Sequence, residues 1–167
     1  MPRRLKISST TRPQPDVYFG AASHGFLNWD TLMWRFAAQH SYWVATQGVV
    51  PHSMPVWGIW QDCAFRFSTP PDSRKAKNLR AHPFANVHLA DTEAVFVLQC
   101  QAVEISNPDQ LEAFVDEYNP RYKWDFRLAD VEHGTFALTP YKAFAWAAGQ
   151  GDGFSNTATR WTLEVQE

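Results

Sequence analysis

The feature that most constrains the fold is a series of short strand-type segments that follow one another with few helices between them. These segments cover residues 42–46, 54–60, 64–69, 85–90, 94–105, 135–140, 142–148 and 159–165. Gly48 lies in the first connection, and Asp62-Cys63 makes the second one tight, as in β-hairpins. Doubly wound sheets alternate strands with helices, which this chain does not do. The pattern therefore predicts a mainly β fold, an antiparallel barrel with a few helices.

Three helices are predicted between these segments. The first runs from about Asn28 or Asp30 to His40. The second opens at Asp72 or Ser73 and stops near His82, because Pro83 follows. The third covers residues 107–120, between two Asn-Pro pairs. On the first and third helices, apolar side chains recur at helical spacing and are expected to face the core: Leu32, Met33, Phe36 and Ala37, then Leu111, Phe114, Val115 and Tyr118.

Length and composition narrow the class of protein. A chain of 167 residues is long enough for one domain with a real core, which we place at residues 28–167, with residues 1–27 as a flexible N-terminal arm. The formal net charge of −2 gives no basic field for nucleic acid. No apolar run could span a bilayer, and the arm lacks the apolar core of a signal peptide, so we expect a cytoplasmic protein without a membrane partner.

Metal and thiol chemistry are not indicated by the sequence. The two cysteines, Cys63 and Cys100, have no metal or redox spacing and are interpreted as free thiols. The six histidines show no helical pair and no clustered ligand spacing, so no metal site is expected. His52 either lines a pocket or makes a structural hydrogen bond in a turn.

The stretch "TPPDSRKAKNL" at residues 69–79 has helix-start signals but carries its charges on an unusual side. A helix N-terminus has a positive partial charge, so its first turn normally favours acids. Here the turn carries Arg74, Lys75 and Lys77. A solvated basic face is the ordinary interpretation. The alternative is a phosphate site, because unpaired N–H groups, Arg and Lys all bind anions, and Thr69 and Ser73 add hydroxyl groups.

The chain resembles the pyridoxamine 5′-phosphate oxidase-like superfamily, the FMN-binding split barrels, also called flavin/deazaflavin oxidoreductases. The main resemblance lies in "PHSMPVWGIWQDCAFRFSTPPDSRKAKNLRAHPFANVHL" (51–89). It continues in "YNPRYKWD" (118–125), "TPYKAFAW" (139–146) and "SNTATRWTLE" (155–164). Four motifs in the family's order, over about residues 28–165, imply an antiparallel split β-barrel.

The resemblance also implies a cofactor site. The family's strand along the flavin ring and ribityl chain matches Ser53, Met54, Pro55, Val56 and Trp57. Pro55 suits an exposed edge, because proline cannot donate to a sheet ladder. The remaining matching positions surround the phosphate or lie near the ring: Ser68, Thr69, Ser73, Arg74, Lys75 and Asn78 at the phosphate, and Arg160 and Trp161 near the ring, commonly from the second subunit of a homodimer.

Departures from the pattern argue against the vitamin oxidase itself. Val95 stands where that enzyme has a polar flavin contact, and its C-terminal Arg-Leu-Ser segment is missing. Trp57 and the Thr-Arg-Trp ending are closest to the branch that contains many users of the deazaflavin coenzyme F-420. FMN users share the phosphate motif, so the implied cofactor is FMN or coenzyme F-420.

The resemblance implies an oxidoreductase that transfers hydride to or from a small organic substrate. Two alternatives remain, a non-catalytic flavin carrier or redox-sensing module, and a dimeric interaction protein that has lost its cofactor. The phosphate motif and the Arg160-Trp161 pair speak against the last. The sequence does not identify a catalytic residue. Tyr118, Tyr122, Lys123 and Trp124 either cap a substrate cleft or pack as a loop after the third helix.

Overall fold

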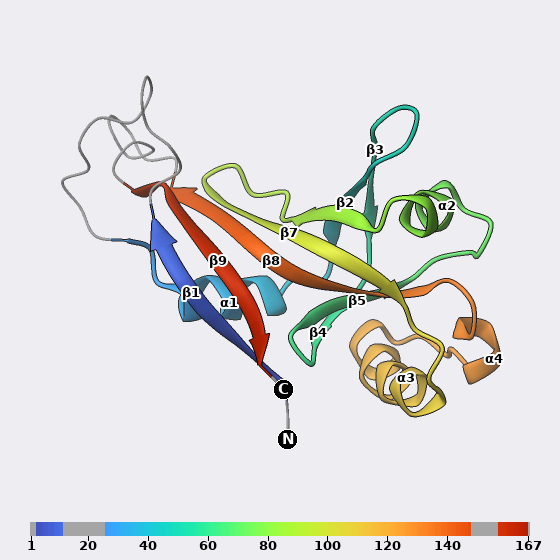
Figure 1. The fold of residues 1–167 in the computed structure, drawn as a ribbon. Helices are drawn as coiled ribbons and strands as arrows, with labels where there is room; N and C mark the ends of the chain where they lie inside the picture. Colours follow the sequence, from blue (N-terminus) through green and yellow to red (C-terminus); the bar gives the residue numbers. More distant parts are fainter. Residues whose placement is uncertain (1–2, 12–25, 148–156, 167) are drawn as a thin grey trace.

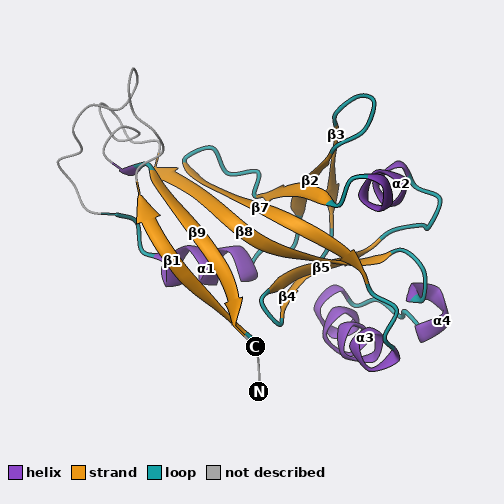
Figure 2. Cartoon of the chain, in the orientation of Figure 1, coloured by secondary structure: helices purple, strands orange, loops and turns teal. Residues whose placement is uncertain are grey.

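The computed structural model describes residues 3–11, 26–147 and 157–166, which form a mainly antiparallel sheet with four helices around it (Figures 1 and 2). The strands are β1 (Arg4–Thr11), β2 (Tyr42–Thr46), β3 (His52–Val56), β4 (Ile59–Gln61), β5 (Ala64–Ser68), β6 (Phe84–His88), β7 (Ala94–Glu104), β8 (Thr135–Ala147) and β9 (Thr159–Gln166). The helices are α1 (Trp29–Ala37), α2 (Arg74–Ala81), α3 (Pro108–Tyr122) and α4 (Leu128–Val131).

The sheet is split because one long strand serves two partners. The strand order is β1-β9-β8-β7-β6-β2-β3, with β4 and β5 off this path. One edge of β8 pairs with β5 through residues 135–138 and with β9 through residues 142–145, while β7 follows the other edge throughout. All of these pairs are antiparallel, which confirms the predicted fold class of a mainly β, antiparallel split barrel.

Two predicted strand boundaries were wrong. Residues 54–60 form two strands, because the chain leaves β3 at Trp57-Gly58 and enters β4. A Cβ on Gly58 would come within 2.3 Å of the Phe65 ring, so only glycine allows this close crossing. Conversely, residues 135–140 and 142–147 form one strand, because the register shift opposite Gln99 and Cys100 absorbs an extra residue as a bulge. Residue 148 lies outside the described residues.

The three predicted helices occur, although α1 ends at Ala37, three residues before the predicted end at His40. Asn28, Ser73 and Asn107 cap α1, α2 and α3 with side-chain acceptors. Helix α3 runs past Pro120 and ends at Tyr122, two residues later than predicted, and Lys123 closes it in the left-handed conformation. The tight connection is confirmed as well, since Asp62 and Cys63 have positive φ values of 49° and 62° between paired β4 and β5.

Residues 1–27 were predicted to be a flexible arm before the domain of residues 28–167, but Arg4–Thr11 belong to the sheet of that domain. These residues form β1, which pairs with β9 from Arg4 opposite Gln166 to Thr11 opposite Arg160. The strand covers an edge of β9 that would otherwise expose unpaired backbone groups. Residues 1–2 and 12–25 of the expected arm lie outside the described residues.

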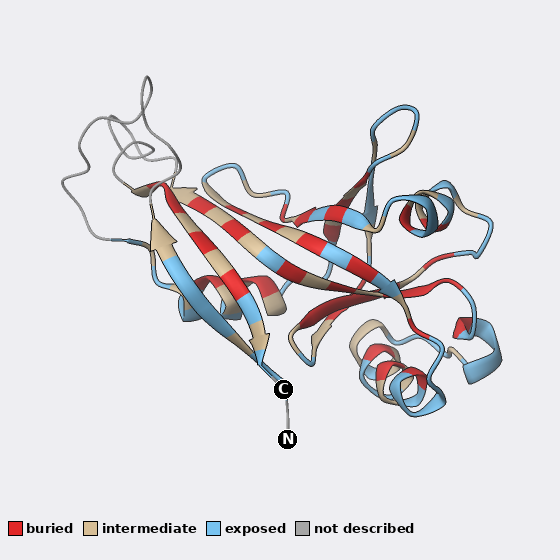
Figure 3. Cartoon of the chain, viewed as in Figure 1, coloured by how far each residue is buried: buried red, intermediate tan, exposed pale blue. Residues whose placement is uncertain are grey.

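The main core lies on one face of the sheet, beneath α1 and α2. It contains the largest buried side chains, among them Phe36, Tyr42, Phe65, Phe96 and Trp161. Buried and less buried residues alternate along β7, β8 and β9 (Figure 3). A smaller core forms under α3 around Phe114 and Tyr118, as its helical spacing predicted. Within the described ranges, the helices are too short and too polar to cross a bilayer.

Candidate functional site

A cleft of about 420 Å³ lies between the ends of β3 and β5 and the start of α2. Six of the predicted site residues line it, namely Pro55, Val56, Trp57, Ser68, Thr69 and Lys75. Ser41, Pro70 and Tyr118 complete its wall. The structure thus gathers the strand of residues 53–57 and the helix start at residues 69–75 around one hollow.

Hydrogen bonds hold the hydroxyl groups of Thr69 and Ser73 at the start of α2. The Thr69 hydroxyl donates to Ser73 Oγ at 3.1 Å, and the Ala76 N–H donates to the same oxygen at 3.2 Å. Because Ser73 Oγ accepts both bonds, its own proton remains available to a ligand. The N–H groups at the first positions of a helix lack helical partners, so this turn offers several donors to one anion.

The two cations of the turn are placed differently. Lys75 is half-buried and lines the cleft, whereas Arg74 is exposed and is not among the lining residues. Burial lowers the pKa of the Lys75 ammonium from its usual value. Neither side chain has an ion-pair partner in the part of the chain that the structure describes. Lys77 instead lies 3.8 Å from Asp72, outside the cleft.

The positive charges of Lys75 and Arg74 also act on His52, at the start of β3. Desolvation, and then the charges of Lys75 and Arg74, lower the pKa of its imidazole. The favoured state of His52 beside the two cations is therefore neutral. An anion bound to Lys75 would offset these charges and remove part of that shift.

A network of hydrogen bonds connects the turn before α2 to β7 and to the loop before β8. Glu104, at the end of β7, accepts two bonds from Arg80 at 2.6 and 2.7 Å and a third from the Gly134 N–H at 2.9 Å. Arg80 also donates to the Pro71 carbonyl at 2.6 Å, and the Gly134 carbonyl accepts from the Thr69 N–H at 3.0 Å. We call Arg80, Glu104 and Gly134 the clamp.

The clamp requires glycine at its third position. Gly134 has φ +92°, and a Cβ there would lie 2.2 Å from the Thr69 carbonyl oxygen. Arg80 neutralises Glu104 and lowers the pKa of its carboxyl group. Sequence reasoning missed all three residues, because they come from α2, β7 and the loop before β8, and only the folded chain joins them.

Strand β3 presents the backbone edge expected for it. It ends the strand order, pairs with β2 alone among the described strands, and places Pro55 opposite Trp43. Ser53, Met54 and Pro55 are exposed along it. Since an edge strand leaves outward backbone groups without sheet partners, β3 can contact a planar ligand through its main chain.

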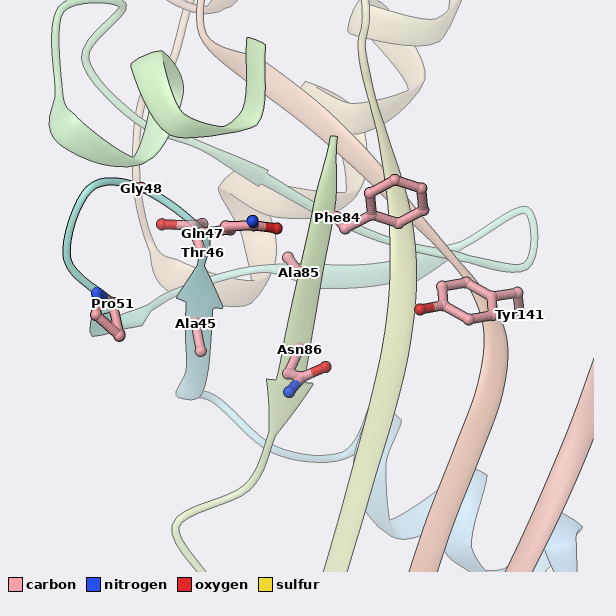
Figure 4. Close-up of a pocket in the computed structure, with 9 residues that line it drawn as sticks. All are labelled: Ala45, Thr46, Gln47, Gly48, Pro51, Phe84, Ala85, Asn86 and Tyr141. Atoms are coloured by element: carbon pink, nitrogen blue, oxygen red, sulfur yellow. The ribbon is translucent and has the colours of Figure 1, made fainter. Parts of the chain in front are cut away.

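Asn78 does not reach the cleft. Its amide donates to Thr46 Oγ1 at 2.9 Å, and it fills the space beside Gly48, so it connects α2 to the β2–β3 turn. That turn borders a second hollow of about 330 Å³ on the outer face of the sheet (Figure 4). Phe84 and Tyr141 form one side of this hollow, with their rings 6.2 Å apart and edge to face.

Arg160 and Trp161 lie far from the cleft within one chain, since β8, β7, β6 and β2 separate β9 from β3. The structure does not place Trp161 at any site: it is 1% exposed and its ring lies 5.5 Å from Trp29 in the core. Arg160 turns to the opposite face and donates to Thr11 Oγ1 at 3.0 Å.

Arg160 nevertheless shares a row with the cleft strand. Paired residues of neighbouring strands lie side by side on the same face of a sheet. Successive pairs connect Arg160 to Phe144, Val97, His88, Trp43 and finally Pro55. We call these six residues the outer row. None of them is buried, and Trp43 stacks on His88 with ring centres 6.4 Å apart.

Within the described ranges, no three His, Cys, Asp or Glu side chains gather in a way that could hold a metal ion. The candidate site therefore rests on cations, hydroxyl groups and backbone donors. Such a donor set suits a phosphate-bearing organic molecule.

Comparisons with known proteins bear on the family and the fold. The family model described as pyridoxamine 5′-phosphate oxidase matches residues 33–147. No match was found among curated protein sequences.

Solved structures resemble the chain in fold. A conserved hypothetical protein from Mycobacterium tuberculosis has a TM-score of 0.62 at 17% identity, covering 72% of this chain and 85% of that one. An FAD-binding protein from Mesorhizobium loti has a TM-score of 0.57 at 13% identity, with coverages of 81% and 96%. An F-420 reductase has a TM-score of 0.50 at 21% identity, with coverages of 62% and 87%.

Proposed function

Because the chain belongs to the pyridoxamine 5′-phosphate oxidase family, we propose that it is an oxidoreductase that uses FMN or coenzyme F-420 for hydride transfer to or from a small organic substrate. The observation that carries this proposal is the cleft. There Lys75 lies near the hydrogen-bonded hydroxyl groups of Thr69 and Ser73, and it has no ion-pair partner among the described residues. The names of two neighbours, an F-420 reductase and an FAD-binding protein, support the choice of cofactor class.

The phosphate of the cofactor would bind at the start of α2. Lys75 supplies a charge-assisted bond, Ser73 donates its free proton, and the first N–H groups of the helix complete the shell. The clamp fixes these donors before the ligand arrives, so little ordering is needed on binding. Arg74, which is exposed, steers the anion electrostatically rather than enclosing it.

The ring system would lie along Ser53–Trp57 at the exposed edge of β3. A bound flavin or deazaflavin supplies the hydride chemistry at its central ring. The chain binds and orients it, and Trp57 and Tyr118 exclude water from one side of the cleft. Solvent can supply or accept the proton that accompanies hydride transfer.

We further propose that two copies pack through the outer row into a homodimer. This row carries Trp43, Phe144 and Val97, none of which is buried in one chain, and such faces commonly mark interfaces. A two-fold axis across the row would bring Arg160 of one copy to the Pro55 end of the other. Arg160 would then stand near the cofactor ring of the second copy.

A binding experiment followed by turnover tests the proposal. The protein is mixed separately with FMN and F-420, desalted, and examined by visible absorbance. Retention of one cofactor, followed by steady-state turnover with a panel of hydride acceptors, is expected. Retention without turnover would favour the carrier or sensor, and retention of neither cofactor would overturn the proposal.

A further inference from the structure

Three aromatic side chains form a corner where β3 ends and α3 ends. The rings of Trp57 and Tyr122 stack at 5.0 Å with 3° between their planes. The ring of Trp124 stands at 83° to Trp57, with the ring centres 6.0 Å apart. We call these three residues the aromatic corner.

Hydrogen bonds hold the corner rigidly. The Tyr122 hydroxyl accepts from the Gly58 N–H at 3.0 Å and donates to the Gly58 carbonyl at 2.7 Å, so it fixes the backbone next to Trp57. On the other side, the Asn119 amide makes two bonds with the backbone of Phe126, at 2.9 and 3.0 Å, across the loop that carries Trp124. Trp57 directly follows β3, and the Trp124 N–H donates to the Asn119 carbonyl at 3.0 Å, which ties its backbone to the end of α3.

Both indoles are nevertheless left open to solvent. Trp57 is 46% exposed and Trp124 is 52% exposed. Two large apolar rings fixed side by side at a surface are unusual in a monomer unless a ligand or partner covers them. Trp57 also lines the cleft with Lys75 and Thr69, so the corner continues the wall of the proposed cofactor site.

The charged groups around the corner give it no net charge of its own. Lys123 and Asp125 flank Trp124, are exposed and carry opposite charges. Arg121, which precedes Tyr122, donates to the carbonyls of Ala37 and Gln39 at the end of α1. Lys75 faces the phosphate position at the start of α2. The corner itself offers ring faces and ring edges, which suit a flat aromatic partner in stacked or edge-to-face contact.

We propose that the aromatic corner is the binding site for a planar, uncharged aromatic or quinoid ring, next to the cofactor. As a binding site, the corner stands on its own geometry. As the substrate site of an oxidoreductase, it rests on the proposed function. It gives that function a substrate class, namely flat neutral rings rather than phosphorylated or aliphatic molecules.

The binding test uses cofactor-free protein and a matched pair of probes. Naphthalene-2-carboxamide is flat, and its fully saturated decalin analogue carries the same amide without the flat ring. We expect isothermal titration calorimetry to give measurable binding of the flat probe and at least threefold weaker binding of the saturated one. Trp57→Ala and Trp124→Ala should each lower the affinity for the flat probe at least threefold, and Trp57→Phe should retain most of that affinity.

Trp34→Ala is the matched control, because Trp34 is an exposed tryptophan (74%) on α1, outside the corner and the cleft. Its affinity should equal that of the unchanged protein. Equal binding of both probes, or an equal loss in Trp34→Ala, would overturn the proposal. So would a change in oligomeric state in Trp57→Ala by light scattering, since this would assign the corner to a protein interface.

A second arm separates this inference from the proposed function. If the cofactor binds, the two corner variants should raise KM for flat acceptors at least threefold while cofactor affinity changes less in Trp124→Ala. If the flat probe binds but no cofactor is retained, the proposed oxidoreductase function would be rejected, while the aromatic corner would remain a binding site. A retained cofactor with an unchanged KM in both variants would reject the corner as the substrate site.

Discussion

At the scale of single residues, Lys75 is the cation whose charge most needs a bound anion as its partner. It is half-buried in the cleft and has no ion-pair partner among the described side chains. Replacing it and its neighbour, as Lys75→Ala with Arg74→Ala, should cost about 1.5–3 kcal/mol of phosphate binding, or roughly tenfold or more in Kd for FMN or F-420. Lys77→Ala is the control, because Lys77 lies outside the cleft. Unchanged Kd values for both cofactors would remove the phosphate assignment.

The lowered pKa of Lys75 gives the same site a pH dependence. Burial disfavours the charged form, so the free protein loses this proton at a lower pH than an exposed lysine does. Cofactor affinity should therefore fall as pH rises toward the lowered pKa, since only the cation binds phosphate strongly. Lys75→Arg keeps its charge over that range. Fluorescence titrations across alkaline pH should show a steeper loss in the unchanged protein, and parallel curves would contradict this.

Arg160 tests whether the second copy contributes to the site. A cation near the pyrimidine side of the ring would stabilise the reduced, anionic cofactor over the oxidised neutral form. Arg160→Ala should then lower the midpoint potential, by about 20 mV for each kcal/mol of lost preference. Thr11→Val removes only the bonding partner of Arg160 and should leave the potential nearly unchanged. A potential that is unchanged or higher in Arg160→Ala would leave Arg160 as a strand residue bonded to Thr11.

At the scale of elements, the clamp couples α2 and β7 to the loop before β8, behind the turn that starts α2. Glu104→Gln weakens its bonds to Arg80 and should raise the Kd for FMN several-fold. Riboflavin lacks the phosphate, so its Kd should not change. Glu112→Gln, on the exposed side of α3, is the control. An equal loss of FMN and riboflavin affinity would mean that the clamp supports the fold in general.

The helices and strands also show which structural features could be predicted from the sequence. Local signals sufficed for the Ser73 cap, the Asp62-Cys63 turn and the core face of α3. The break at Gly58 was missed because its cause is Phe65, a residue of the opposite strand. The clamp was missed for the same reason, since each of its contacts joins segments distant in sequence. Lys75 and Thr69, which the resemblance assigns to the phosphate, line the cleft. The resemblance also carried over Trp161, whose neighbour Trp29 makes it part of the core.

At the scale of the whole molecule, the outer row predicts assembly. Light scattering at micromolar concentration should give a homodimer, because this face joins side chains from six strands, Phe144, Val97 and Trp43 among them. Val97→Glu places a charge at the middle of the row and should yield monomers with weaker cofactor binding. Val49→Glu is the control, on a fully exposed turn. A monomer that retains its cofactor would contradict the proposed interface.

The pairing of β1 with β9 sets the order in which this sheet can form. Arg4 and Gln166 are neighbours across the two strands, so the pairing closes a loop of almost the whole chain. The entropy of closing a loop rises only slowly with its length, by about 0.6 kcal/mol per doubling, so the finished sheet loses little stability. Its kinetics are affected more, because such distant contacts form after local ones. Until then one edge of β9 stays open, and during folding the chain carries a temporary template for pairing with other chains.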